Sequence, residues 1–170
     1  MRVFISTVPF GENDRSPLDL LEESGLDYLI NPYGRKLKEE ELTELVGDFD
    51  VLIAGTEPIK KAVLSKSDKL KLIARVGIGV DSVDLLGARD HDILVTYTPD
   101  APSAAVAELT IGLMLSLLRS IHLSNRDLHR CEWHRHFGRR LSECSIGIIG
   151  AGRIGSRVIE HLSSFDCKRV

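Results

Sequence analysis

Short apolar runs alternate with amphipathic segments through the first hundred residues of this chain. We predict strands at five runs that are rich in β-branched and aliphatic residues: 2–6, 28–30, 51–54, 70–76 and 93–97. Between them, apolar residues at helical spacing predict four helices: 16–23, 39–46, 60–66 and 80–89. Because such alternation is typical of βαβ units, the pattern predicts an α/β fold. It would begin with a doubly wound parallel sheet of about five strands in the flavodoxin-like order.

A turn rich in proline separates this sheet from the rest of the chain. Pro99 and Pro102 cannot join regular strand pairing, and Ser103 is suited to cap a following helix. We therefore expect one domain over residues 1–99 and the start of a second over residues 100–170.

The longest apolar stretch follows this turn, at 104–118. It is shorter than the roughly 20 residues that a bilayer span needs, so we expect a buried helix and no membrane anchor. Glu108 lies within this stretch. Because an unpaired buried carboxylate is costly, we expect Glu108 to be hydrogen-bonded and structural, not catalytic.

A glycine motif lies in the second part of the chain. Gly150, Gly152 and Gly155 follow an apolar run, 145–149, that is typical of a strand, and they precede a helical segment, 156–162. In the dinucleotide-binding fingerprint the first glycine permits a tight turn and the second leaves room for the pyrophosphate. The third lets the helix approach the strand. A glycine turn that binds nothing is the alternative interpretation.

The start of that helix supplies two further predicted cofactor contacts. The N–H groups of Arg153 and Ile154 can donate to a pyrophosphate, and the Arg153 side chain can add positive charge. The fingerprint also expects an acidic ribose ligand about 20 residues on, after a second strand. That strand would begin at Cys167, so its ligand would fall beyond Val170. We therefore expect an incomplete Rossmann domain, and the choice between NAD and NADP stays open.

Composition and charge exclude several kinds of partner. The 170 residues are 43% hydrophobic and 28% charged, which suits a packed core with a polar surface. A net charge of −3 gives no electrostatic reason to expect nucleic acid or an anionic membrane. The three cysteines have no paired spacing, and the first apolar run is too short for a signal peptide. Both features favour a cytoplasmic protein.

One stretch contains residue types that bind metals: His129, Cys131, His134 and His136. Its spacing matches no standard zinc pattern. We therefore prefer a solvated arm at this place over a zinc site, and we predict that no metal binds.

Three motifs in register carry a family resemblance. They are Arg75–Asp84 with its Gly-x-Gly turn, Val106–Thr110 with the later Leu118-Arg119, and the segment from Leu141 to Gly155, preceded by Trp133. Together they resemble the D-isomer-specific 2-hydroxyacid dehydrogenases, in particular the phosphoglycerate dehydrogenase-like proteins.

The resemblance implies hydride transfer between NAD and the C2 carbon of a D-2-hydroxy acid. It places Val76, Gly77 and Ile78 against the substrate, with Ile78 and Val106 near the nicotinamide. Residues 1–99 would be the substrate-binding and catalytic lobe, and the rest would begin the NAD-binding domain.

The resemblance also bears on catalysis and assembly. The family's catalytic arginine, glutamate and histidine would all lie beyond residue 170, so no catalytic residue is assigned here. We therefore expect this chain to be inactive by itself. A homodimer would form through the helix at 104–120 and the arm after it.

The first motif has a physical interpretation of its own. Gly77-x-Gly79 after a strand places flexible backbone at the carboxyl edge of the sheet, where open α/β folds bind ligands and N–H groups can approach an anion. Taken alone, it would be an ordinary strand-to-helix turn. Arg75 is not assigned the catalytic role, and we expect it to form an ion pair with Asp81 or Asp84.

The chain departs from the family pattern at Ala54–Glu57, where the phosphoglycerate branch carries an Arg-Ser pair that helps to bind substrate. 3-Phosphoglycerate is therefore only one candidate, with Lys60 or Lys61 as a substitute cation. Two alternatives remain: a non-catalytic NAD-binding sensor or interaction module on the same fold, and an FMN binder built on the first lobe.

Overall fold

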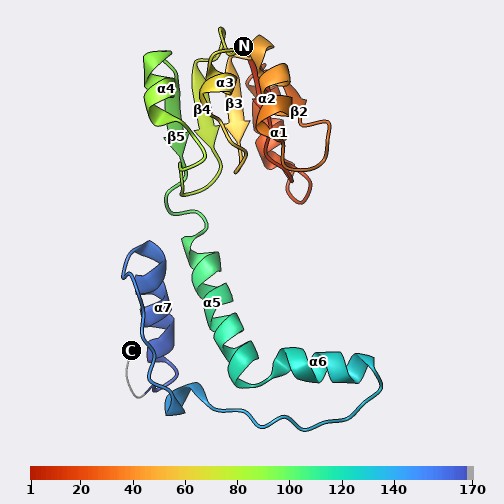
Figure 1. Ribbon diagram of the computed structural model, residues 1–170, viewed down its shortest axis with the longest axis vertical. Coiled ribbons are helices and arrows are strands. Elements are labelled where there is room, and N and C mark those ends of the chain that lie inside the picture. The colour runs from red at the N-terminus through yellow and green to blue at the C-terminus, as the bar shows by residue number, and fades with distance from the viewer. Residues whose placement is uncertain (168–170) are drawn as a thin grey trace. The chain divides into compact units, whose positions relative to one another are not determined.

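The computed structural model describes residues 1–167 and divides into two compact units, most of whose elements are labelled in Figure 1. The first unit is Met1–Pro99, and the second begins at Asp100. Each has its own hydrophobic core. The second strand predicted from Cys167 onward lies, apart from Cys167, outside the described residues.

Strands and helices alternate through the first unit. In chain order they are β1 (Arg2–Ile5), α1 (Ser16–Glu23), β2 (Asp27–Ile30), α2 (Glu39–Leu45), the 3-10 helix η1 (Val46–Asp48), β3 (Val51–Ala54), α3 (Lys61–Leu64), β4 (Leu72–Arg75), α4 (Leu85–Asp90) and β5 (Leu94–Tyr97). The second unit contains α5 (Ser103–Leu118), α6 (Ile121–His129), the 3-10 helix η2 (Leu141–Glu143) and α7 (Arg153–Ser163).

The sheet of the first unit is entirely parallel, with the strand order β2-β1-β3-β4-β5. This is the flavodoxin-like doubly wound order, so the predicted fold class is confirmed. The order reverses between β1 and β3, because the chain moves from β1 outward to β2 and then returns to β3 on the other side. All five carboxyl ends therefore lie along one edge of the sheet.

Hydrophobic cores cover both faces of this sheet. Successive side chains of a strand point to opposite faces. Phe4 and Leu52 are buried in a core that also contains residues of α2, α3 and α4. Val3 and Ile5 are buried on the opposite face, in a core that includes Leu18 of α1. The sheet is thus covered on both faces, as its continuous apolar strands predicted.

Helix α4 begins at Leu85, five residues later than the sequence pattern predicted. The Asp84 carboxylate caps it by accepting a hydrogen bond from the N–H of Gly87 at 2.9 Å. Before the cap, Val83 forms a β-bridge with Ile59, which holds this segment outside the helix. Val80 and Val83, which precede the cap, therefore belong to the loop before α4 and not to a face of the helix.

Helices α5 and α7 form the core of the second unit through Ala107, Ile111, Val158 and Leu162, all of which are buried. Only one face of α5 is covered in this way. The prediction of a buried helix is therefore correct for one face only, because α7 and the segment around Leu141 cover one side of α5.

The opposite face of α5 is exposed, and the expectation for Glu108 fails with it. Glu108 is exposed and has no hydrogen-bond or ion-pair partner among residues 1–167. Leu109, Leu113 and Leu117 are 61%, 56% and 70% exposed and recur once per helical turn. No single helix in the described part of the chain has the length and apolar character to cross a bilayer, although α5 and α6 together meet that test with a 66° bend between them.

Two local predictions in the second unit differ from the structure. Pro102, not Ser103, is the N-cap residue of α5, and the buried hydroxyl of Ser103 has no hydrogen-bond partner within the described chain. The run 145–149 forms only a β-bridge at Ser145, and the strand predicted beside it lies, apart from Cys167, outside the described residues. A strand needs a neighbour to accept and donate its backbone hydrogen bonds, and residues 1–167 provide no such ladder there.

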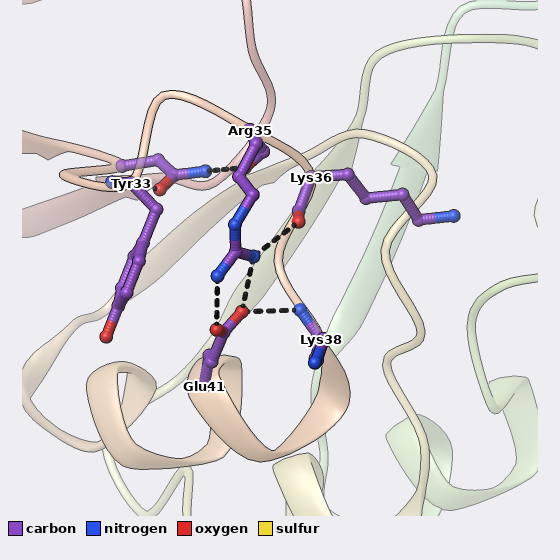
Figure 2. A network of polar contacts seen from close by, with 6 residues as sticks. Tyr33, Arg35, Lys36, Lys38 and Glu41 are labelled. Atoms are coloured by element: carbon purple, nitrogen blue, oxygen red, sulfur yellow. Dashed lines mark hydrogen bonds and ion pairs between the residues drawn. The ribbon is translucent and has the colours of Figure 1, made fainter.

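A polar network holds the loop after β2, as Figure 2 shows. The buried Asn31 amide donates to the carbonyl oxygens of Ser6 and Arg35, at 2.9 and 2.8 Å. The Arg35 guanidinium donates twice to the Glu41 carboxylate, at 2.6 and 2.9 Å, and the N–H of Lys38 donates to Glu41 at 2.9 Å. These donors lower the pKa of Glu41 from 4.5 to about 2, with the Arg35 hydrogen bond as the largest cause.

The Glu41 pKa generates a prediction about pH. A carboxyl group whose folded pKa is depressed stabilises the fold above its unfolded pKa, and this contribution is lost as the pH falls through the folded pKa. We therefore expect Glu41→Gln to lower the Tm at pH 7, with the difference shrinking between pH 4.5 and about 2. Thermal unfolding followed by circular dichroism measures this difference.

Glu44→Gln is the matched control, because Glu44 is exposed on the same helix and has no polar partner among the described residues. Its Tm should follow that of the unmodified chain at every pH. Equal Tm values for Glu41→Gln and Glu44→Gln at pH 7 would contradict the role given to the Arg35–Glu41 pair.

Candidate functional site

The glycine motif of the second unit forms a bare turn before α7. Gly150 has a φ of +93°, a left-handed conformation that glycine adopts without strain. A Cβ at Gly155 would overlap the carbonyl oxygen of Gly150, so α7 and the preceding turn can approach only through a glycine. A Cβ at Gly152 would meet nothing within 4 Å. The three glycines therefore have three different physical roles, and the middle one faces open space.

The N-terminus of α7 supplies free donors at this turn. The N–H groups of Arg153, Ile154 and Gly155 have no acceptor in the described chain, and the N-cap Gly152 provides no side-chain acceptor. Such groups, with the helix dipole behind them, favour a phosphate. The residues present fit the diphosphate part of a dinucleotide.

The Arg153 side chain is engaged elsewhere. Its guanidinium donates to the Asp100 carboxylate at 2.8 Å, and both side chains are more than half exposed. A phosphate would therefore compete with Asp100 for this cation, whereas the Arg153 backbone N–H is free. A groove of about 340 Å³ runs beside the turn, lined by Gly150, Ile154 and residues of α5 and α7.

The second predicted site is the turn after β4 in the first unit. Gly77 has a φ of +141°, and a Cβ there would overlap the guanidinium of Arg75. The N–H of Gly77 donates to the hydroxyl of Thr98 at 2.8 Å, and the N–H of Val76 donates to the Ala54 carbonyl at 2.8 Å. These two amides are therefore already used in the fold.

Backbone N–H groups without an acceptor lie one and two residues after Gly77. The N–H groups of Ile78 and Gly79 have no acceptor within residues 1–167. Val76 is 46% exposed and Ile78 is half-buried, so the turn presents both backbone and apolar surface. Val106 is 37% exposed on α5. The binding roles predicted for Val76, Gly77, Ile78 and Val106 remain predictions.

Arg75 does not form the ion pair predicted for it. Its guanidinium is buried under the Gly77 turn and donates to the Val76 carbonyl. Asp84 caps α4 instead, and Asp81 is exposed and accepts from Lys60 through its backbone carbonyl at 3.0 Å. The short separation in sequence suggested a pair, but the turn directs the arginine inward and the loop directs the aspartates away.

Sequence reasoning missed a second buried charge at the same edge. Glu57 is 1% exposed, and its carboxylate accepts from the Ser6 hydroxyl and, at 2.8 Å, from the N–H of Gly55. A signal was present, because Glu57 follows a predicted strand by three residues, where α/β folds place functional groups. In the sequence alone this residue is visible only as part of the departure from the family pattern at Ala54–Glu57.

The arm with the histidines is partly anchored. The ring of His136 lies 2.7 Å from the Asp127 carboxylate, and this contact is the first cause, with Arg126 the second, of a lowered Asp127 pKa. Trp133 and Phe137 are 84% and 97% exposed, as a solvated arm predicts. Within the described residues no three His, Cys, Asp or Glu side chains gather as metal ligands would.

The family model described as D-isomer specific 2-hydroxyacid dehydrogenase, catalytic domain, matches residues 7–165. The D-3-phosphoglycerate dehydrogenase of Methanocaldococcus jannaschii is 43% identical over 133 residues, which cover 76% of this chain and 25% of that protein.

Solved structures give the same result. The TT0316 protein from Thermus thermophilus matches with a TM-score of 0.88 and 32% identity, over 99% of this chain and 55% of its own. The NAD+-bound 3-phosphoglycerate dehydrogenase of Entamoeba histolytica matches with a TM-score of 0.78 and 28% identity, over 99% of this chain and 52% of its own. This chain thus spans about a quarter of the curated relative and about half of each structure.

The resemblance seen in the sequence is therefore confirmed by a family model that matches nearly the whole chain. The family includes NAD-dependent dehydrogenases of 2-hydroxy acids. This chain belongs to the D-isomer specific 2-hydroxyacid dehydrogenase family.

Proposed function

We propose that this chain is part of an NAD-dependent oxidoreductase that transfers a hydride between the nicotinamide and C2 of a D-2-hydroxy acid. Met1–Pro99 would be the substrate-binding lobe, and the unit from Asp100 would begin the NAD-binding domain. The observation that carries the proposal is the bare turn at Gly150–Gly155, with three free N–H groups at the start of α7, in a chain of this family.

In this proposal the second unit binds the cofactor through its main chain. The N–H groups of Arg153, Ile154 and Gly155 donate to the diphosphate, and the absence of a side chain at Gly152 lets the phosphates approach. Bound NAD supplies the hydride acceptor. Val106, on the exposed face of α5, would contact the nicotinamide through its apolar surface.

The first unit binds the substrate carboxylate. The free N–H groups of Ile78 and Gly79 are the donors in this proposal, and Val76 and Gly77 shape the turn that presents them. Arg75, buried directly beneath, adds a positive charge that favours an anion at this place. A 2-hydroxy or 2-keto acid carries its carboxylate next to the reacting carbon, so a ligand held here would have C2 beside this turn.

The proposed protein is a cytoplasmic homodimer that needs no metal. Cys131, Cys144 and Cys167 are all free thiols, which suits a reducing compartment. The exposed leucines of α5 would form the interface with a second copy.

Cofactor binding can be tested at Gly152. We expect Gly152→Val to weaken NAD binding by roughly tenfold or more, because the new side chain fills the space over the free N–H groups. The fold should be retained, since nothing lies within 4 Å of the added Cβ, with a small loss of Tm because valine is a poorer N-cap residue than glycine. Shifts of the Ile154 and Gly155 amide resonances during an NAD titration measure the affinity.

Gly112→Ala, in the middle of α5 with open space around it, is the control and should leave NAD binding intact. An unmodified chain whose Ile154 and Gly155 amides do not respond to NAD would refute the cofactor site.

The proposed hydride transfer requires a general acid within hydrogen-bond reach of the substrate oxygen, and the turns after the strands of the first unit offer no histidine for this role. We expect no NADH consumption with 2-keto acids from the pure 170-residue chain. Turnover above a buffer blank, followed at the NADH absorbance, would show that this assignment is wrong.

Dimer formation can be tested on the exposed face of α5. We expect Leu113→Glu to shift the chain from dimer to monomer, because it places a charge at the centre of the Leu109–Leu117 stripe. Leu94→Glu is a matched control, since Leu94 is 71% exposed but lies on β5. Size-exclusion chromatography with light scattering gives the mass. A monomeric unmodified chain at high concentration would contradict the proposed dimer.

A further inference from the structure

The arm after α6, residues 130–140, is held by backbone hydrogen bonds near both of its ends. Near its start, the N–H of Glu132 donates to the carbonyl of Asp127 at 2.9 Å. Near its far end, the N–H of Arg139 donates to the carbonyl of Leu118 at 2.9 Å. The arm therefore leaves α6 and returns to the C-terminal end of α5 as a closed loop.

A side-chain contact holds the arm between these two points. Nε2 of His136 lies 2.7 Å from one carboxylate oxygen of Asp127, and the Arg126 guanidinium donates twice to the other oxygen, at 2.9 and 3.0 Å. The side chains of His136 and Asp127 are only 16% and 9% exposed. These contacts, His136 first and Arg126 second, hold the pKa of the Asp127 carboxyl below its usual range, so it is a carboxylate at neutral pH. Asp127 thus holds the arm through both its backbone and its side chain.

The charged and titratable side chains around His136 belong to α6 and to the arm itself. They are Asp127, Arg126, Glu132, His134 and Arg135. The ring of His134 lies edge-on to that of His136, with the ring centroids 4.5 Å apart. Within residues 1–167, only Asp127 lies within ion-pair distance of the His136 ring. The strength of this contact depends on the charge of the ring, and imidazole is the side-chain group that changes charge between pH 5 and 8.

The arm presents two large aromatic side chains to solvent. Trp133 and Phe137 are 84% and 97% exposed, on either side of the anchored histidine. Aromatic side chains are enriched at protein interfaces. Gly138, which follows Phe137, packs on the end of α5, because a Cβ there would lie 2.7 Å from the Leu118 carbonyl oxygen. The neighbouring Leu117 is 70% exposed, so the exposed apolar surface of α5 reaches the arm at this point.

The arm is also basic. Residues 130–140 contain four arginines and one glutamate, in a chain whose net charge is −3. The remainder of the chain is therefore acidic, and a second copy offers the arm a surface of opposite charge. The partner that fits both the apolar and the basic character of the arm is another molecule of this protein.

We propose that the contact between His136 and Asp127 makes association with a second copy depend on pH, because it fixes the arm in the shape that the second copy binds. The inference rests on the proposed homodimer, to which it adds a means of regulation. With a protonated ring the contact is a charged pair, and with a neutral ring it is a weaker, single hydrogen bond. A fixed arm loses less conformational entropy on association than a loose one. Asp127 is therefore a positioning residue, and the dimer is tighter at pH 6 than at pH 8.

The test measures the dissociation constant of the dimer at pH 6 and pH 8 by analytical ultracentrifugation. We expect the unmodified chain to associate roughly fivefold more tightly at pH 6, because a charge-assisted hydrogen bond is stronger than a neutral one. His136→Gln retains a donor for Asp127 but cannot gain a charge, so its dissociation constant should change little between the two pH values. His129→Gln is the matched control and should keep the pH dependence. His129 is exposed on the same helix as Asp127, and its ring contacts the backbone carbonyl of Asn125 at 2.8 Å instead of a carboxylate.

Trp133 gives a second readout, because it is the only tryptophan of the chain. Its fluorescence anisotropy reports the mobility of the arm at a dilution where light scattering shows a monomer. We expect the anisotropy of the unmodified chain to be higher at pH 6 than at pH 8, and that of His136→Gln to be equal at both. The unmodified chain thus tests the inference even if the variant does not fold.

The inference is overturned if the unmodified dimer is equally stable at both pH values, or if a folded His136→Gln keeps the pH dependence. Equal anisotropy of the unmodified chain at both pH values overturns it as well. The proposed homodimer survives all three results. A chain that is monomeric at both pH values at high concentration contradicts the homodimer itself, and the inference falls with it.

Discussion

Parallel backbone pairing determines which groups can meet at the functional edge of the first unit. The ladder continues one residue beyond the strands, where the N–H of Ser6 donates to the Ile53 carbonyl and the N–H of Val76 donates to the Ala54 carbonyl. This alignment brings the loops after β1, β3 and β4 side by side. Parallel pairing also requires helical crossovers, which cover both faces and leave the carboxyl edge as the place where polar loops gather. The segments that carry Glu57 and Arg75 are neighbours for this reason, although 17 residues separate these two residues in sequence.

Both candidate sites depend on main chain that no side chain covers. At Gly77 the backbone passes directly over a buried guanidinium, and at Gly155 a helix meets the carbonyl of a turn. A Cβ at Gly77 would push the backbone away from the Arg75 guanidinium, and a Cβ at Gly155 would push α7 away from the Gly150 carbonyl. The same close approach leaves N–H groups without acceptors nearby, which makes an anion a suitable partner. The spacing of glycines therefore indicates where free N–H groups can bind an anion, as well as where the chain turns. For this reason a few short motifs were enough to identify the family.

The sequence predicted the regular parts of the structure well because local periodicity decides them. Helix α1 has the bounds that its apolar spacing indicated, and β3 has the bounds of its aliphatic run. The parallel order also followed from the alternation of strands and helices. Local periodicity does not predict features that depend on contacts between residues far apart in sequence. Helix α4 begins late because Ile59, far away in sequence, pairs with Val83.

The errors at the sites have the same origin. Arg75 was paired with nearby aspartates by sequence distance, but the turn directs it inward beneath Gly77. Glu108 was expected to be buried because its neighbours are apolar, yet it lies on the face of α5 that is exposed. Glu57 was noticed only for what it replaces, since its partners Ser6 and Gly55 belong to different strands. Periodicity predicts which face a residue occupies, not what lies opposite that face.

The crowding over Gly55 limits how this edge can change during evolution. Any side chain at position 55 would displace either the Thr7 hydroxyl or the Glu57 carboxylate, so a single replacement there carries a steric cost. A smaller residue at position 7 or 57 would remove that cost beforehand. The effects of substitutions at these three positions on stability are therefore expected to be non-additive. A larger residue at position 55 is therefore expected to follow a change to a smaller residue at position 7 or 57.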